Sequence, residues 1–204
     1  MSEAMTKALA RYRAQAPLEW GEEAALVPRS TARLLAILDT SSSMDRRDAG
    51  EEGTQRRVDV LKEALDDLAE TFPGQVEVIG FGTEPFALNL HDKLRPAGST
   101  NLYKALVFAE YQARAIGNVV LVGDGQPTDG KVEEAVGLVS EWKLAGVRFS
   151  VIYCGPEGGR GAKTLQRLAE AGGGDYSHCR VKADQLLEAL SDALLIVSPG
   201  TIQL

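Results

Sequence analysis

The chain has 204 residues, of which 44% are hydrophobic and 25% are charged, and its formal net charge at pH 7 is −7. These proportions are typical of one soluble globular domain whose core is large enough to fold without disulfide bonds. The acidic balance argues against a general nucleic-acid partner, which needs a basic face, and no apolar run is long enough to cross a membrane.

The first residues carry basic side chains but lack the apolar core of a signal peptide. We therefore expect a cytoplasmic protein that has no membrane partner. Because disulfides are rare in that compartment, the two cysteines, Cys154 and Cys179, are expected to be buried thiols.

Residues 1–30 are expected to form an N-terminal arm or extension, and residues 31–204 a single domain without internal repeats. The segment from Ala4 to Ala16 is rich in alanine, which favours a short helix that Pro17 ends. A loosely held terminal arm explains the same composition, and both interpretations stay open.

In the first half of the domain, the sequence predicts two buried strands, one helix and one edge strand. Ala32 to Asp39 is a continuous apolar run, typical of a parallel strand buried on both faces. Apolar residues at three- and four-residue steps predict a helix over Arg56 to Phe72. Gln75 to Gly82 predicts the second strand. Glu84 to Leu90, with Pro85 near its start, predicts an antiparallel edge strand.

The second half of the domain alternates helices with strands. Helices are expected over residues 101–116, 129–142, 162–171 and 183–196, and strands over residues 118–123, 147–154 and 175–180. Such alternation joins strands through right-handed crossovers. The expected fold is therefore α/β, a doubly wound and mostly parallel sheet with one antiparallel edge strand and helices on both faces.

Alternating serines follow the strand that ends at Asp39. Asp39, Ser41 and Ser43 offer three hard oxygen ligands on a short turn, which suits Mg²⁺ better than Zn²⁺. An Asx or Ser turn that caps a following helix explains the same residues. Taken alone, the turn leaves both interpretations open.

Two further loops are expected to bring polar residues to the same edge of the sheet. In open α/β sheets, ligands bind beyond the carboxyl ends of the strands, near the reversal in strand order. Asp124 ends a later apolar strand as Asp39 ends the first, and Thr100 lies in a loop directly before a helix. Together with Ser41 and Ser43, they make five oxygen ligands, enough for an octahedral Mg²⁺ that keeps a position for water or a ligand.

These three loops resemble the metal-ion-dependent adhesion site (MIDAS) of the von Willebrand factor A (vWA) family. Asp39-Thr40-Ser41-Ser42-Ser43 matches the family's DxSxS motif, Ser99-Thr100-Asn101-Leu102 its threonine loop, and Asp124-Gly125-Gln126-Pro127 its TDGxP turn. Gly123 stands where the family commonly has threonine, which removes a hydroxyl near the site but no ligand. The resemblance covers residues 31–204.

The resemblance implies a vWA/Rossmann-like fold and a metal-dependent protein-binding module. The expected ion is Mg²⁺, with Mn²⁺ or Ca²⁺ as alternatives. Hydroxyl ligands leave positive charge on the ion, so the implied anchor is an Asp or Glu of a protein partner. Relatives work beside AAA+ ATPases or in multi-protein systems, and in some of them ligation displaces the C-terminal helix, here 183–196. The implied metal ligands are Asp39, Ser41, Ser43, Thr100 and Asp124.

Two other functions fit parts of this pattern. A strand ending in Asp39 resembles the nucleophile strand of haloacid-dehalogenase-like phosphatases. Those enzymes need a second aspartate where this chain has Ser41, and a hydroxyl cannot deliver the proton. The sequence also offers no Ser-His-Asp or Cys-His arrangement, so we do not expect an enzyme. The remaining alternative is a vWA scaffold that needs no metal.

Several polar residues are expected to have structural roles. Asp129 offers a sixth oxygen ligand for the metal, but it is expected instead to cap the helix that follows it. The charged, glycine-containing segment 45–55 is expected to form a solvated loop. His91 and His178 have no partners at metal-ligand spacing and are expected to be ordinary surface or strand-edge histidines.

The glycine-rich loop 155–161 lies between a predicted strand and a predicted helix, a position from which it could hold a phosphate. It lacks the order of the known phosphate-binding motifs. Arg160 and Lys163 lie in or beside this loop, and they offer positive charge for a phosphate or for a partner's charge near the metal.

Overall fold

The computed structural model describes residues 32–50, 52–88, 93–125, 127–179 and 183–195. The expected arm, residues 1–30, and His91 lie outside the described residues. Within the described part of the chain, no helix is long and apolar enough to cross a membrane.

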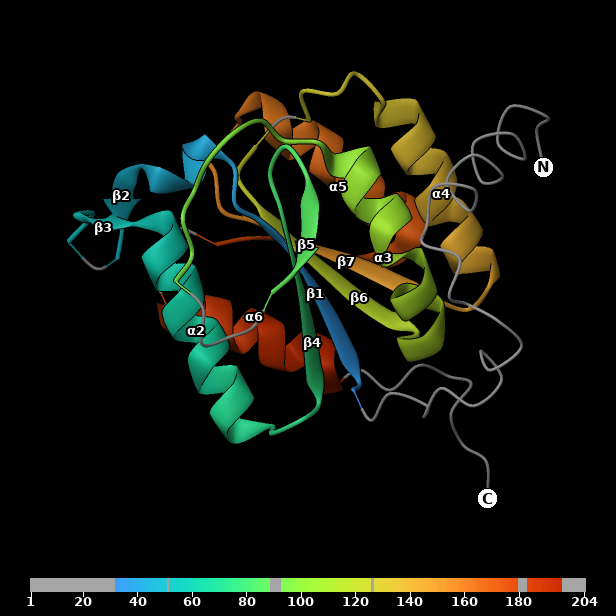
Figure 1. Ribbon diagram of the computed structural model, residues 1–204, viewed down its shortest axis with the longest axis horizontal. Helices are drawn as coiled ribbons and strands as arrows, with labels where there is room; N and C mark the ends of the chain where they lie inside the picture. The colour runs from blue at the N-terminus through green and yellow to red at the C-terminus, as the bar shows by residue number, and fades with distance from the viewer. Residues whose placement is uncertain (1–31, 51, 89–92, 126, 180–182, 196–204) are drawn as a thin grey trace.

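A six-stranded sheet forms the centre of the domain (Figure 1). In spatial order its strands are β5 (Pro85–Ala87), β4 (Val76–Phe81), β1 (Leu34–Asp39), β6 (Asn118–Gly123), β7 (Arg148–Tyr153) and β8 (Gly173–His178). All neighbours are parallel except β4 and β5, which pair antiparallel. The order reverses between β1 and β6, because the chain first builds outward from β1 through β4 and then resumes on the other side. The predicted doubly wound sheet is confirmed.

Helices cover both faces of this sheet, as predicted (Figure 1). One face carries α2 (Arg57–Thr71) and α6 (Ala183–Leu195). The opposite face carries α3 (Leu102–Ile116), α4 (Val132–Leu144) and α5 (Arg160–Gly172). Each helix starts and ends within a few residues of its expected bounds.

Strand β1 is buried along its whole length because its side chains alternate between two hydrophobic cores. Leu34, Ala36 and Leu38 pack in the core beneath α2 and α6. Leu35 and Ile37 pack in the core beneath α3, α4 and α5. Full burial of such a side chain contributes about 1.5–3 kcal/mol. With both faces held, the strand presents its last residue at the carboxyl edge of the sheet.

The segment 45–55, expected to be a loop, contains regular structure. A 3₁₀ helix, η2 (Ser42–Asp45), leads into β2 (Arg47–Ala49), which pairs antiparallel with β3 (Gln55–Arg56). The prediction was wrong because charge indicates exposure but does not exclude pairing. Gly50 and Gly53, with φ angles of 78° and 66°, allow the chain to reverse, and Ala49 is buried against the core of α2.

Cys154 and Cys179 are free and buried, as expected. Burial raises the pKa of the Cys154 thiol well above its usual value. Because the thiolate is the reactive form, this cysteine behaves as a small apolar side chain of the core.

Candidate functional site

Three loops meet where the strand order reverses. Asp39 is the last residue of β1, Asp124 directly follows β6, and Thr100 lies two residues before α3. Because β1 and β6 are hydrogen-bonded neighbours, the two aspartates lie at the same edge of the sheet. Asp39, Thr100 and Asp124 are only 1%, 6% and 7% exposed. Buried groups of this kind need polar or ionic partners.

Hydrogen bonds connect the serine turn to both aspartates. The Ser41 N–H donates to Asp39 Oδ1 at 2.8 Å, and the Ser41 and Ser43 hydroxyl oxygens lie 3.0 Å apart. The Ser43 hydroxyl donates to Asp124 Oδ1 at 2.7 Å. Four of the five residues predicted as metal ligands therefore form one connected polar network.

Thr100 faces the same small space as Asp39. Its loop is held by Thr128, whose hydroxyl oxygen accepts from the Thr100 N–H at 3.0 Å and whose N–H donates to the Thr100 carbonyl at 2.9 Å. A Cβ atom built on Gly125 would lie 3.1 Å from Asp39 Oδ2 and 3.1 Å from Thr100 Oγ1. The structure thus brings all five predicted residues together, and Gly125 leaves a space between two of their oxygens.

Gly123, which departs from the family's motif, also borders Asp39. A Cβ atom at this position would lie 3.0 Å from Asp39 Cβ and 3.3 Å from Asp39 Oδ2. Such contacts are tighter than ordinary van der Waals separation. The glycine therefore leaves room for the Asp39 side chain in the position that it takes here.

A buried arginine that sequence reasoning missed belongs to the same network. Arg57, the first residue of α2, is 3% exposed; its guanidinium pairs with Asp124 Oδ2 and donates to Asp48 Oδ1 at 2.7 Å. Hydrogen bonding to Arg57 lowers the pKa of Asp48. The sequence did carry a signal, because Arg57 shares a helical face with Leu61 and Leu68, where a charge requires a buried partner.

The electrostatic state of Asp39 is set mainly by its burial. Burial is the largest cause that raises the pKa of Asp39 from 3.8 to about 7, and the negative charge of Asp124 adds to it, whereas hydrogen bonds from Ser41 act in the opposite direction. Near neutral pH, this carboxyl group is therefore partly protonated in the metal-free protein. A cation beside it would take the place of the proton.

The donors assembled at this edge suit a hard cation. They comprise two carboxylates and three hydroxyls, a set of oxygen donors that suits Mg²⁺ better than Zn²⁺. Within the described ranges, no group of three or more His, Cys, Asp or Glu side chains is placed to hold a metal ion. A cation at this edge would therefore depend on the hydroxyls as much as on the carboxylates.

The other polar residues considered from the sequence have local partners. Asp129 accepts hydrogen bonds from the Tyr103 N–H at 3.0 Å and the Lys131 N–H at 3.2 Å, which ties the start of α3 to the loop before α4. The N-cap residue of α4 is Lys131, two residues after Asp129, so the prediction that Asp129 caps this helix was wrong. His178 Nε2 lies 2.9 Å from the Gly155 carbonyl oxygen.

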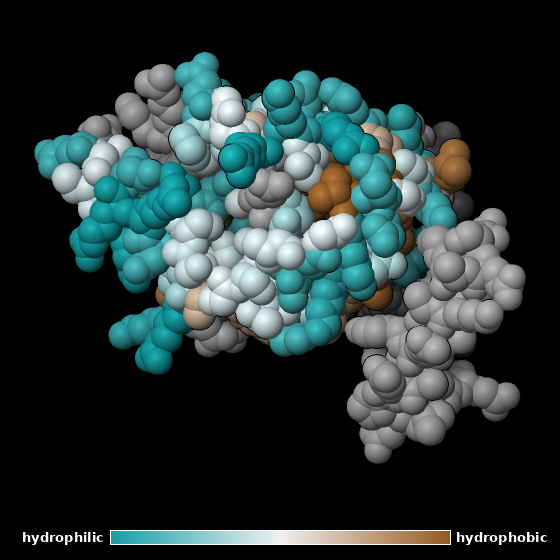
Figure 2. Space-filling view, turned by 90° about the horizontal axis from the view of Figure 1, so that it is seen from above, coloured by the Kyte–Doolittle hydropathy of each residue, from teal (hydrophilic) through white to brown (hydrophobic). Residues whose placement is uncertain are grey.

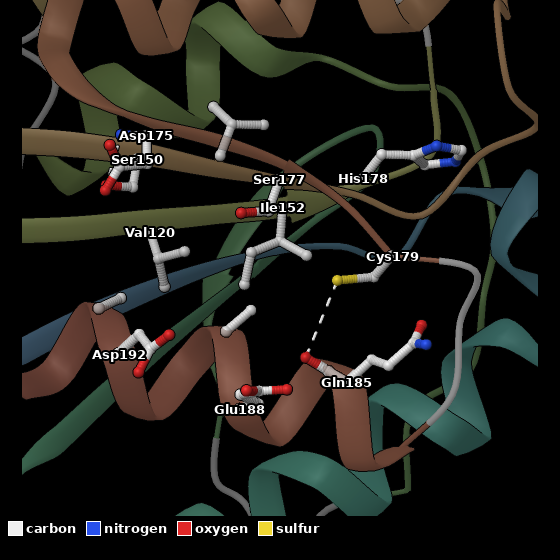
Figure 3. Close-up of a pocket in the computed structure, with 13 residues that line it drawn as sticks. Val120, Ser150, Ile152, Asp175, Ser177, His178, Cys179, Gln185, Glu188 and Asp192 are labelled. Atoms are coloured by element: carbon white, nitrogen blue, oxygen red, sulfur yellow. Dashed lines mark hydrogen bonds between the residues drawn. The ribbon is translucent and has the colours of Figure 1, made fainter.

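A cavity of about 420 Å³ lies between α6 and the strands β6, β7 and β8 (Figure 3). Glu188 and Asp192 reach it from α6, and His178 lies at one end of it in this view. The Cys179 thiol contacts the Gln185 carbonyl oxygen at 3.9 Å. None of the five predicted metal ligands lines this cavity, so it is separate from the site at the strand reversal.

Comparison with known proteins identifies the fold. No family model matches the sequence, and no curated protein matches it significantly. An aerotolerance-related membrane protein from Bacteroides fragilis, a variant with multiple mutations to serine, is similar in structure with a TM-score of 0.61 and 19% identity, over 80% of this chain and 98% of that chain. The conserved hypothetical protein BatB from Bacteroides thetaiotaomicron is similar with a TM-score of 0.61 and 18% identity, over 80% of this chain and 97% of that chain.

A third similar structure is proximal thread matrix protein 1 from the mussel byssus, described with a zinc-occupied MIDAS motif. Its TM-score is 0.58 at 19% identity, over 80% of this chain and 44% of that chain. At these identities the likenesses show the fold alone. This fold is the vWA type of the Rossmann-like α/β sheet, as the sequence predicted.

Proposed function

We propose that this domain binds a divalent cation, with Mg²⁺ as the preferred ion, and through it an acidic side chain of a protein partner. The observation that carries the proposal is the meeting of oxygen donors from three separate loops at the strand reversal. The space that Gly125 leaves between two of these donors supports a small ion as the ligand. The proposed ligands are Asp39, Ser41, Ser43, Thr100 and Asp124.

The charges around the proposed site favour an anionic partner. A bound cation supplies a positive centre with an open coordination position for a carboxylate. Both oxygens of Asp124 are already engaged, one by Ser43 and the other by Arg57, so its negative charge is largely neutralised within the protein. A divalent ion held largely by neutral hydroxyls would itself keep positive charge, which an Asp or Glu of the partner can balance.

We propose binding and not catalysis at this site. A pocket at the strand reversal is lined by Ser41, Ser43 and Thr100 among others. Of its described lining residues, Asp124 is the only acid, and it is ion-paired with Arg57. A phosphatase of the kind considered from the sequence needs a free carboxylic acid two residues after Asp39, where Ser41 instead contacts Ser43. The chemistry of the site therefore supports holding a ligand.

Calorimetric titration of the protein with Mg²⁺ tests the metal part of the proposal. We expect saturable binding, and we expect Asp39→Ala to lower the affinity by about 100-fold or more because it removes a charged ligand. Asp67→Ala, which removes an exposed carboxylate on α2, is the matched control. A parent protein that takes up no Mg²⁺ would leave the metal-independent scaffold as the better reading. Turnover of a generic phosphate ester would favour the phosphatase.

The partner part of the proposal needs a separate measurement. Proteins retained by the immobilised domain in Mg²⁺ should be released by chelator and should not bind Asp39→Ala. Retention that is independent of metal in both proteins would overturn the adhesion-site function even if Mg²⁺ binds.

The space at Gly125 gives a steric test of where the ion lies. Gly125→Ala is expected to lower Mg²⁺ affinity about tenfold or more, since its methyl group would occupy the space between Asp39 Oδ2 and Thr100 Oγ1. Calorimetry measures the affinity, and circular dichroism checks that the fold is retained. Gly137→Ala on α4, where an added Cβ meets nothing within 4 Å, is the control. Equal affinities in the two variants would mean that the ion lies elsewhere.

A further inference from the structure

Basic side chains dominate the rim of the pocket at the strand reversal. The pocket has a volume of about 360 Å³, and its charged lining residues are three arginines, Arg46, Arg57 and Arg160, and one aspartate, Asp124. The charged side chains that line the pocket are mainly positive, whereas the formal net charge of the whole chain is −7. The pocket is therefore a place where an anionic group is attracted on an otherwise acidic protein.

The three arginines differ in what they already bind. Arg57 is buried and paired with Asp48 and Asp124. Arg46 and Arg160 are exposed, and neither forms an ion pair within the described part of the chain. Two guanidinium groups on the rim are thus available to an incoming anion, and guanidinium groups are well suited to binding carboxylates.

The backbone at Arg46 is held in place by the metal-site turn. Arg46 directly follows η2 as its C-cap, and its N–H donates to the Ser43 carbonyl at 3.2 Å. Its own carbonyl accepts from the Arg57 N–H at 3.1 Å. Arg46 is therefore attached directly to one proposed metal ligand and to the arginine that binds another.

The loop that precedes Arg160 packs closely on Tyr153, the last residue of β7. The Tyr153 hydroxyl donates to the Pro156 carbonyl at 3.1 Å. Cβ atoms built on Gly155 and Gly159 would lie 2.3 Å and 2.4 Å from that hydroxyl, so the glycines permit the close approach. The loop leads into α5 with no acidic residue in its first turn, and the positive end of the helix dipole adds to the charge of Arg160.

We propose that Arg46 and Arg160 form a second anion-binding position beside the metal site, so that the domain recognises a protein segment carrying two acidic side chains. One carboxylate binds at the metal and the other binds the rim arginines. This inference rests on the proposed function for its first anchor. The face of the molecule drawn in Figure 2 is mostly hydrophilic, with smaller hydrophobic areas.

The test compares two short blocked peptides, one with a single aspartate among glycines and one with two aspartates separated by one glycine. Binding is followed by NMR titration of the full chain in Mg²⁺. We expect the two-aspartate peptide to bind about fivefold more tightly, in keeping with one or two partly exposed ion pairs. In Arg46→Gln/Arg160→Gln this preference should disappear, while Mg²⁺ affinity measured by calorimetry is unchanged or slightly higher.

The controls are Arg47→Gln and Lys163→Gln, which remove exposed charges next to the two arginines but outside the pocket lining. Both should keep the fivefold preference. A preference that survives in the double variant, or equal binding of the two peptides by the parent, would overturn the inference. Binding that persists in chelator but is lost in the double variant would uphold the rim position and refute the metal anchor, so the two proposals fail separately.

Discussion

Replacing Arg57 with methionine is expected to lower the free energy of unfolding of the metal-free domain by about 3–5 kcal/mol. The guanidinium is almost fully buried and pairs with Asp124, which is itself 7% exposed. Removing one partner of a buried ion pair leaves the other charge desolvated and uncompensated, and this costs more than the lost packing. The expected loss is large enough to threaten folding of an ordinary domain.

Urea unfolding at pH 7.5, in chelator and in Mg²⁺, measures the effect. Mg²⁺ should restore part of the stability of Arg57→Met, since the proposed ion supplies positive charge beside Asp124. Asp48→Asn is the control for the outer half of the network, and it should cost much less because the Asp48 side chain is 50% exposed. A loss below about 1 kcal/mol in Arg57→Met would show that Asp124 does not depend on this arginine.

The second large effect concerns Asp39. Its pKa is raised from 3.8 to about 7 in the folded, metal-free protein, mainly by burial. Between about pH 4 and pH 7, the folded protein therefore keeps a proton on Asp39 that the unfolded chain has already released. In this window the contribution of Asp39 to stability falls as pH rises, and above pH 7 the full cost of a buried carboxylate is present. A shift of this size corresponds to about 4 kcal/mol.

Asp39→Asn is accordingly expected to be more stable than the metal-free parent at pH 8, by up to about 4 kcal/mol, and to differ little from it near pH 4. Chemical unfolding of both proteins across this range in chelator gives the difference. Asp67→Asn, a change on the exposed face of α2, should follow the parent. Equal pH profiles for Asp39→Asn and the parent would contradict the burial argument.

The same variant separates stability from the proposed function. Asp39→Asn gains stability only without metal, because Mg²⁺ binding would offset the cost of the parent's ionised carboxylate. A buried carboxylate that lowers the stability of the metal-free fold is the kind of cost that a binding site imposes on a protein.

The sequence by itself determined the strands and helices of the main sheet and their order along the chain. A continuous apolar run such as 34–38 can only be satisfied by burial on both faces, and helical spacing in α2 and α3 identifies their buried sides, so short-range patterns were sufficient. It also placed Asp39 and Asp124 at the ends of strands. Parallel strands bring such ends to one edge, which is why the grouping of the five candidate ligands could be predicted.

The tertiary structure alone decided the contacts that no local pattern encodes. Arg57 and Asp124 are 67 residues apart, and their pairing follows from the cost of burying either charge alone. The β2–β3 hairpin forms because two turn glycines and a buried alanine outweigh a charged composition. Arg46 and Arg160 reach one pocket only because η2 and the start of α5 meet at the strand reversal. Charge placement in space depends on packing, and packing is a property of the whole fold.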